Sequence, residues 1–98
     1  MAKQRLYFKV EIDWAYEGER YGKVFYYSCY SRAELHEFIN EQTEALAFQW
    51  VNEHYWGYAN DYSDEFALFE AILSKFVHHI YEVPPASFYN VNYATMRI

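Results

Sequence analysis

The chain opens with a segment in which apolar and polar residues alternate one for one. The apolar members of this segment are Leu6, Phe8, Val10, Ile12 and Trp14. A period of two is typical of a β-strand with one face on a core and one face in water. Turn residues around Gly18 follow, and the aromatic run from Lys23 to Tyr30 favours a second strand. The first 30 residues therefore predict a β-hairpin.

The next pattern has the spacing of a helix. Ser31 and Glu34 fit a capping box, in which the serine oxygen accepts from the third helical N–H. Helix-forming residues continue to about Trp56, and Gly57 fits a C-cap. The apolar residues that share one side of this helix are Leu35, Phe38, Ile39, Leu46 and Trp50.

A second helix is predicted after Asp61 or Ser63, either of which can cap it, with Asp64 and Glu65 in its first turn. Its apolar side consists of Phe66, Phe69, Leu73, Phe76, Val77 and Ile80. Lys75, His78 and His79 occupy its last turns, and Pro84 and Pro85 prevent further helix.

Residues 86–98 favour a third strand, since aromatic and β-branched residues alternate with asparagines there. The predicted fold class is therefore α+β, in the order ββααβ. We expect a three-stranded antiparallel sheet with an αα-hairpin packed on one face. At 98 residues, the chain is expected to form a single domain, residues 1–98.

Charge is distributed unevenly. The net charge is −6, yet residues 33–74 hold nine acidic residues and no Lys or Arg. So negative a chain disfavours direct binding to nucleic acid, which proteins contact with clustered cations. There is one cysteine, no signal-peptide pattern and no apolar run near 18 residues. We therefore expect a soluble, cytoplasmic protein without a membrane partner.

The acidic residues of the first helix form the most distinctive pattern. Glu34, Glu37, Glu41 and Glu44 are spaced by three, four and three residues, so they project from the side opposite the core residues. These four residues are called the acidic stripe. A solvated face that keeps the protein soluble would also be acidic, although such faces usually mix both signs.

The functional interpretation of the acidic stripe is a surface that fits a basic groove on another protein. Phe48 and Tyr55 fall on the same side of the helix, where aromatic side chains can anchor a partner. The predicted partner-binding residues are Glu34, Glu37, Glu41, Glu44, Phe48, Tyr55, Asp61, Asp64 and Glu65.

Motifs that carry chemistry are missing from the sequence. It has no Gly-rich phosphate loop, no nucleophile elbow and no Cys or His spacing typical of a metal site. We therefore expect neither an enzyme nor a bound cofactor or metal.

Tyrosines suggest an alternative site on the open face of the sheet. Tyr7 points to the same side as Arg5 and Lys9, and either Tyr26 or Tyr27, and either Tyr89 or Tyr93, can join it. Such a face can serve as a homodimer or partner interface, or as a stacking platform for single-stranded nucleic acid. A solvated tyrosine ladder is the third explanation.

In its size, segregated charge and acidic stripe, the chain resembles the anti-defence inhibitors of phages and mobile elements, a class that includes anti-CRISPR and anti-restriction proteins. The resemblance implies a viral protein in the host cytoplasm that mimics nucleic acid. Its partner would be the basic surface of a nucleic-acid-binding protein. The function expected from the sequence is therefore that of a non-enzymatic inhibitor or adaptor.

Overall fold

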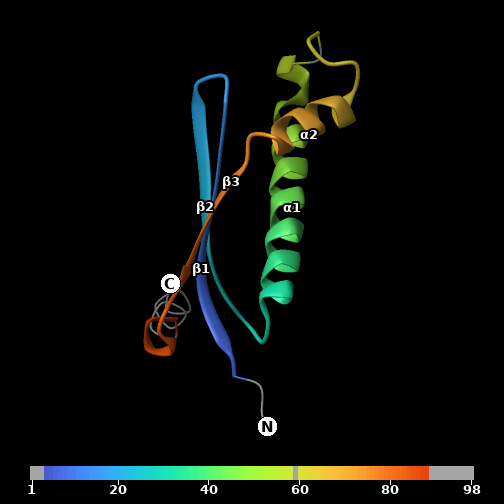
Figure 1. The fold of residues 1–98 in the computed structure, drawn as a ribbon. Coiled ribbons are helices and arrows are strands. Elements are labelled where there is room, and N and C mark those ends of the chain that lie inside the picture. Colours follow the sequence, from blue (N-terminus) through green and yellow to red (C-terminus); the bar gives the residue numbers. More distant parts are fainter. Residues whose placement is uncertain (1–3, 59, 89–98) are drawn as a thin grey trace.

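A computed structural model describes residues 4–58 and 60–88 (Figure 1). The elements are β1 (Leu6–Tyr16), β2 (Glu19–Cys29), α1 (Arg32–Tyr58), α2 (Glu65–Leu73) and β3 (Val77–Glu82). The three strands form one antiparallel sheet in the order β2-β1-β3. An α+β fold with a three-stranded antiparallel sheet is therefore confirmed.

The predicted hairpin is formed by β1 and β2, which pair along their whole length from Leu6 opposite Cys29 to Tyr16 opposite Glu19. Glu17 and Gly18 join the strands, and both have positive φ angles, 53° and 82°. This combination is that of a type I′ turn, whose twist suits a hairpin and whose second position suits glycine.

The side chains of β1 alternate between the two faces of the sheet, as predicted. Phe8, Val10, Ile12 and Trp14 are buried, and the residues between them are half-buried on the other face. As the central strand, β1 thus supplies one apolar row to the core.

Helix α1 begins at the predicted cap. The Glu34 backbone N–H donates to Ser31 Oγ at 3.2 Å. The Glu34 carboxylate accepts from the Tyr30 N–H at 3.1 Å, one residue before the partner that a capping box would use. The predicted C-cap is wrong, because Gly57 lies within a helix that continues to Tyr58.

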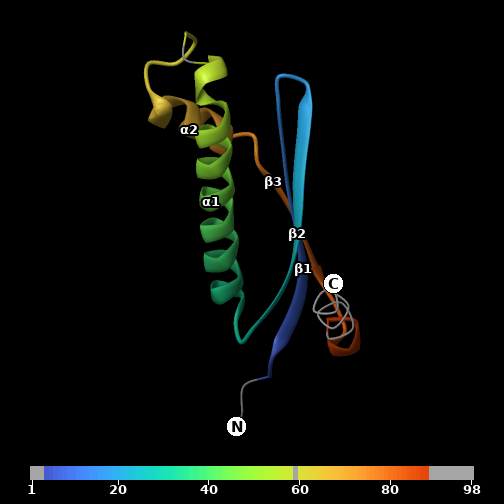
Figure 2. The same cartoon turned by 180° about the vertical axis from the view of Figure 1, so that it is seen from behind.

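The buried side of α1 packs over one face of the sheet, and Figures 1 and 2 show the helix running alongside the hairpin. Of the predicted apolar residues, Leu35, Ile39, Leu46 and Trp50 are buried. Phe38 is half-buried and stacks on Tyr27 of β2, with ring centroids 4.0 Å apart.

Aromatic rings at the tip of the hairpin pack against the C-terminal half of α1. The Trp50 ring meets those of Tyr16 and Tyr21 edge-on, at centroid distances of 5.4 and 6.1 Å. Trp14 stacks between Tyr21 and Phe76, at 5.5 and 4.7 Å. Such pairs add to the free energy gained by burial, so α1 is held against the sheet along its length.

The predicted second helix is too long. Asp64, not Asp61 or Ser63, caps α2, and the helix ends at Leu73 with Ser74 as its C-cap. Residues Val77–Glu82 form β3 instead and pair with the free edge of β1. Pairing satisfies the backbone groups of that edge, and this tertiary gain outweighs the local helical spacing.

The predicted third strand over residues 86–98 is not the one observed. Residues 85–88 form a helical turn, and residues 89–98 lie outside the described part of the chain. Phe88 is buried and lies against Tyr7, with ring centroids 5.2 Å apart.

A buried hydroxyl of α1, that of Thr43, makes a hydrogen bond to β3. The Thr43 hydroxyl donates to the Ile39 carbonyl at 2.7 Å, so its oxygen is left to accept from His78 Nε2–H at 2.8 Å. Desolvation at this junction, and to a smaller extent the neighbouring His79, lower the pKa of His78.

This lowered pKa predicts a pH dependence of stability. The unfolded chain binds a proton more readily than folded His78, so the free energy of unfolding should fall as the pH drops below about 6.5, the ordinary histidine value. The loss should level off once the pH passes below the lowered pKa of His78.

Urea unfolding of the wild type and of His78→Gln between pH 5 and 7.5 measures the effect, and the variant should show a flatter dependence of stability on pH. His36→Gln, at an exposed position of α1, is the matched control. Equal slopes for wild type and His78→Gln would contradict this account.

Candidate partner-binding surface

The acidic stripe lies on the side of α1 that faces away from the sheet. Glu37, Glu41 and Glu44 are exposed, whereas Glu34 is half-buried and takes part in the cap of the helix. Glu37, Glu41 and Glu44 are therefore available to a partner, whereas Glu34 also has a structural role.

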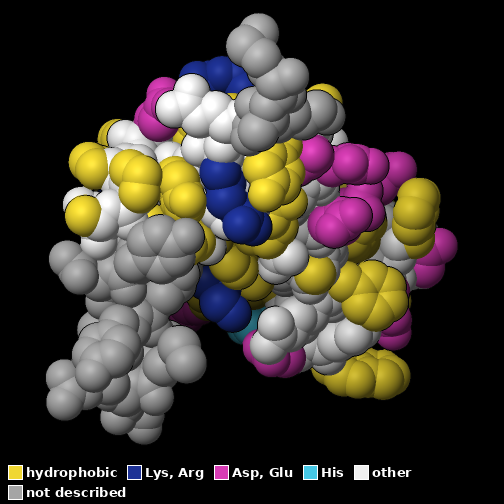
Figure 3. Space-filling model, turned by 90° about the horizontal axis from the view of Figure 1, so that it is seen from below, with side chains coloured by type: hydrophobic (Ala, Val, Ile, Leu, Met, Phe, Trp, Pro, Cys, Tyr) yellow, Lys and Arg dark blue, Asp and Glu magenta, His cyan; other side chains and the backbone are white. Residues whose placement is uncertain are grey.

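The contacts found for Lys and Arg side chains within the described residues lie away from the acidic stripe. The ion pairs found in residues 4–58 and 60–88 are Lys9–Glu11 at 3.3 Å, Arg32–Glu82 at 3.9 Å and His79–Asp13 at 3.9 Å. Arg5 lies over the Tyr30 ring, 5.3 Å from its centroid. None of these contacts reaches the acidic stripe. Figure 3 shows acidic side chains over the helical side of the molecule and Lys and Arg in a separate band nearer the sheet.

The two predicted aromatic anchors differ in their surroundings. Phe48 is 62% exposed and meets Phe69 of α2 edge-on, at a centroid distance of 6.2 Å. Tyr55 is half-buried and packs against the core cluster. Trp56, which is not one of the predicted anchors, is 85% exposed. Phe48 is thus an available anchor, and Tyr55 is mainly part of the core.

The three other acidic residues predicted to bind a partner lie around the start of α2. Asp64 is the N-cap of the helix, and its side chain accepts from the Ala67 N–H at 2.8 Å. Asp61 is exposed in the turn before the helix, and Glu65 is exposed in its first turn. Capping thus gives Asp64 a structural role, and all three side chains are exposed.

An aromatic groove between α1 and α2 was not expected from the sequence. It consists of two adjoining hollows of about 640 and 370 Å³ that share Phe48, Asn52 and Phe69. Carboxylates border both hollows: Glu41, Glu44 and Glu53 line the larger, and Glu65 lines the smaller. The sequence signal was present in Phe66 and Phe69. The helical spacing assigned both to the core, but Phe66 is 64% exposed.

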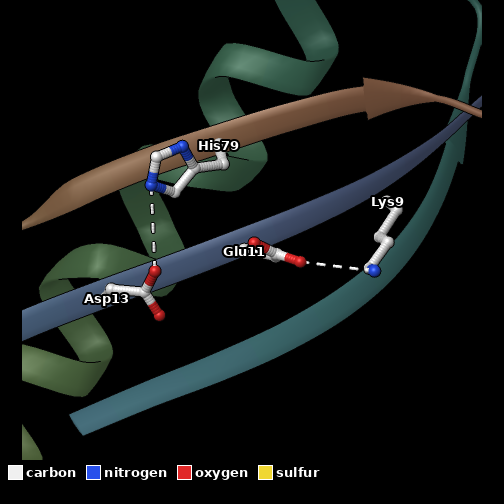
Figure 4. A network of polar contacts seen from close by, with 4 residues as sticks. All are labelled: Lys9, Glu11, Asp13 and His79. Atoms are coloured by element: carbon white, nitrogen blue, oxygen red, sulfur yellow. Dashed lines mark ion pairs between the residues drawn. The ribbon is translucent and has the colours of Figure 1, made fainter.

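The open face of the sheet carries the predicted tyrosines only in part. Tyr26 and Tyr81 flank Lys9 on the two neighbouring strands, and the Lys9 ammonium lies 5.8 Å from the centroid of the Tyr81 ring. Tyr27 is on the opposite face, against Phe38. Tyr89 and Tyr93 lie outside the described residues. Figure 4 shows the Lys9–Glu11 and Asp13–His79 pairs on this face, so it is mixed in charge.

Groups suited to catalysis or metal binding are sparse. Burial raises the pKa of the Cys29 thiol, which donates to the Ser31 carbonyl, so the thiolate is disfavoured there. Within residues 4–58 and 60–88, no group of three or more His, Cys, Asp or Glu side chains could hold a metal ion. In the same residues, no helix combines the length and apolar character that crossing a membrane requires.

Comparison of the chain with protein-family models, with curated proteins and with solved structures gave no match.

Repulsion among the exposed residues of the acidic stripe predicts a stability effect of its own. Glu41 is four residues after Glu37 and three before Glu44, so Glu41→Gln removes two repulsive pairs, each costing about 0.2–0.5 kcal/mol. The free energy of unfolding should therefore rise by about 0.4–1 kcal/mol at low ionic strength, and the gain should shrink at about 1 M salt. Chemical denaturation at the two salt concentrations measures both effects. Glu70→Gln, at an exposed position of α2 with no acidic residue three or four places away, is the control. A loss of stability in Glu41→Gln would mean that the carboxylate has a favourable partner.

Proposed function

We propose that this protein is a non-enzymatic inhibitor or adaptor that binds a basic, nucleic-acid-handling surface of another protein. The observation that carries the proposal is the exposed part of the acidic stripe, Glu37, Glu41 and Glu44, which no Lys or Arg in the described residues neutralises. In this proposal α1 and α2 act together as one helical layer, the αα-hairpin expected from the sequence.

The support for this proposal is first a matter of geometry. Neighbouring carboxylates on a helix lie about 5–6 Å apart, and α1 is packed along the sheet through Leu35, Ile39 and Leu46. The backbone that carries these charges is therefore already ordered, so binding has to order only the exposed glutamate side chains.

Electrostatics then favour one class of partner. Arg and Lys side chains that bind phosphate also bind carboxylate, often through two parallel hydrogen bonds in the case of Arg. A row of carboxylates can thus occupy a groove that otherwise holds a nucleic-acid backbone. The segregated charge also increases the rate of association with a cationic surface. An anti-defence role in the host cytoplasm, of the anti-CRISPR or anti-restriction type, is the biological setting that we propose.

A second candidate function rests on the row formed by Tyr26, Lys9 and Tyr81 across the open face of the sheet. Two tyrosines beside a cation suit a homodimer or partner interface, and they can also stack on bases. Glu11 and Asp13 on the same face oppose a polyanion, so the protein-interface version is the better supported of the two.

Charge reversal tests the main proposal. The wild-type chain serves as bait in a lysate of the native host, and the captured protein is then purified. The double variant Glu37→Lys/Glu41→Lys should bind this protein at least about tenfold more weakly, a loss of about 1.4 kcal/mol. Isothermal titration calorimetry measures the affinity.

The matched control is Glu17→Lys/Glu19→Lys, which changes the net charge equally at the exposed tip of the hairpin. It should retain most of the affinity. Equal affinity of the stripe variant and the wild type would leave the acidic stripe as a solvated face and reject the proposal.

A further inference from the structure

We propose that the groove between α1 and α2 accepts the apolar side of a basic amphipathic helix belonging to the partner protein. The inference rests on the proposed function for its charge complementarity, and it adds the chemistry and the shape of the segment that is recognised.

Aromatic exposure is the first observation. Phe48 and Phe66 are 62% and 64% exposed, and both rings lie next to the half-buried ring of Phe69, at centroid distances of 6.2 and 6.3 Å. Three neighbouring phenylalanines therefore form one apolar patch that spans two helices. Contiguous exposed apolar surface of this kind marks binding sites in soluble proteins.

The second observation is the shape of this patch. The hollows of about 640 and 370 Å³ adjoin at Phe48, Asn52 and Phe69, and together they make up the groove. A groove between two packed helices is suited to a third helix whose large apolar side chains recur every three or four residues.

The hydrogen-bonding needs of its backbone favour a helix over an extended strand as the occupant of the groove. Both walls of the groove are helices, whose backbone groups are already bonded within α1 and α2. An extended segment would leave its own N–H and C=O groups without partners in an aromatic groove, whereas a helix satisfies them internally.

The charge of the occupant follows from the border of the groove. Glu41, Glu44, Glu53 and Glu65 line it, and none of its lining residues is Lys or Arg. Glu41 and Glu44 also belong to the acidic stripe, so the groove and the stripe form one surface. A partner helix with Lys and Arg beside its apolar residues matches both.

Other occupants fit less well. Within residues 4–58 and 60–88, a second copy of this chain has no basic helix to offer, since α1 contains a single Arg at its first residue and α2 has no Lys or Arg. The same carboxylates repel anionic lipid headgroups.

A synthetic peptide titration tests the inference. The first probe is an 18-residue helical peptide with Leu along one side and Lys and Gln on the other. The second replaces each Leu by Gln at the same charge, and the third keeps Leu but replaces each Lys by Gln. Fluorescence anisotropy of labelled peptides measures affinity, and far-UV circular dichroism reports helix formation on binding.

We expect the first peptide to bind wild-type protein at least about tenfold more tightly than either of the others, gaining helix as it binds. Phe48→Ser/Phe66→Ser should lose this preference for Leu, and Glu41→Gln/Glu44→Gln should lose the preference for Lys. Trp56→Ser, an exposed aromatic position of α1 that lines neither hollow, should bind like the wild type. Thermal melts establish that each variant is folded; the substituted residues are exposed.

Three results would overturn the inference. If the Gln-for-Leu peptide binds as tightly as the first, the groove is unused, and the charge-based function stands alone. If the Gln-for-Lys peptide binds as tightly, the acidic border is unused, and the proposed function fails with the inference. If light scattering shows a wild-type dimer that Phe48→Ser/Phe66→Ser converts to a monomer, the occupant of the groove is a second copy of the chain.

Discussion

The packing of α1 along one face of the sheet is the interaction on which the rest of this structure depends. The apolar row of β1, with Val10 and Ile12 fully buried, meets the apolar side of the helix. Because side chains on a helix have fixed angular positions, burial of Leu35 and Ile39 directs Glu37, Glu41 and Glu44 to solvent. Core packing and surface charge are thus two consequences of one helical register.

Much of the fold follows from local patterns. Alternation from Leu6 to Trp14 predicted β1 and its buried face, and Ser31 with Glu34 predicted the start of α1. The segment Val77–Glu82 was assigned to a helix because its apolar residues continue the spacing of α2. Its true state depends on the free edge of β1, a partner about 70 residues earlier in the chain that no local window contains.

The candidate surface was predictable to a similar extent. The acidic stripe needs only the period of a helix, and the structure places its exposed members as expected. Asp64 illustrates the limit, because an acidic residue near a helix start can bind a partner or cap the helix, and here it caps. The groove depends on how α2 lies against α1, so Phe66 and Phe69 could not be distinguished from core residues by spacing alone.

The central claim is that Glu37, Glu41 and Glu44, which no Lys or Arg of the described residues neutralises, bind a cationic surface of another protein. A structure of the complex with the captured partner tests this claim most directly. We expect Arg or Lys nitrogen atoms of the partner within about 4 Å, the range of an ion pair, of the carboxylates of Glu37, Glu41 and Glu44. A complex in which the partner contacts only the open face of the sheet, with these carboxylates left in solvent, would contradict it.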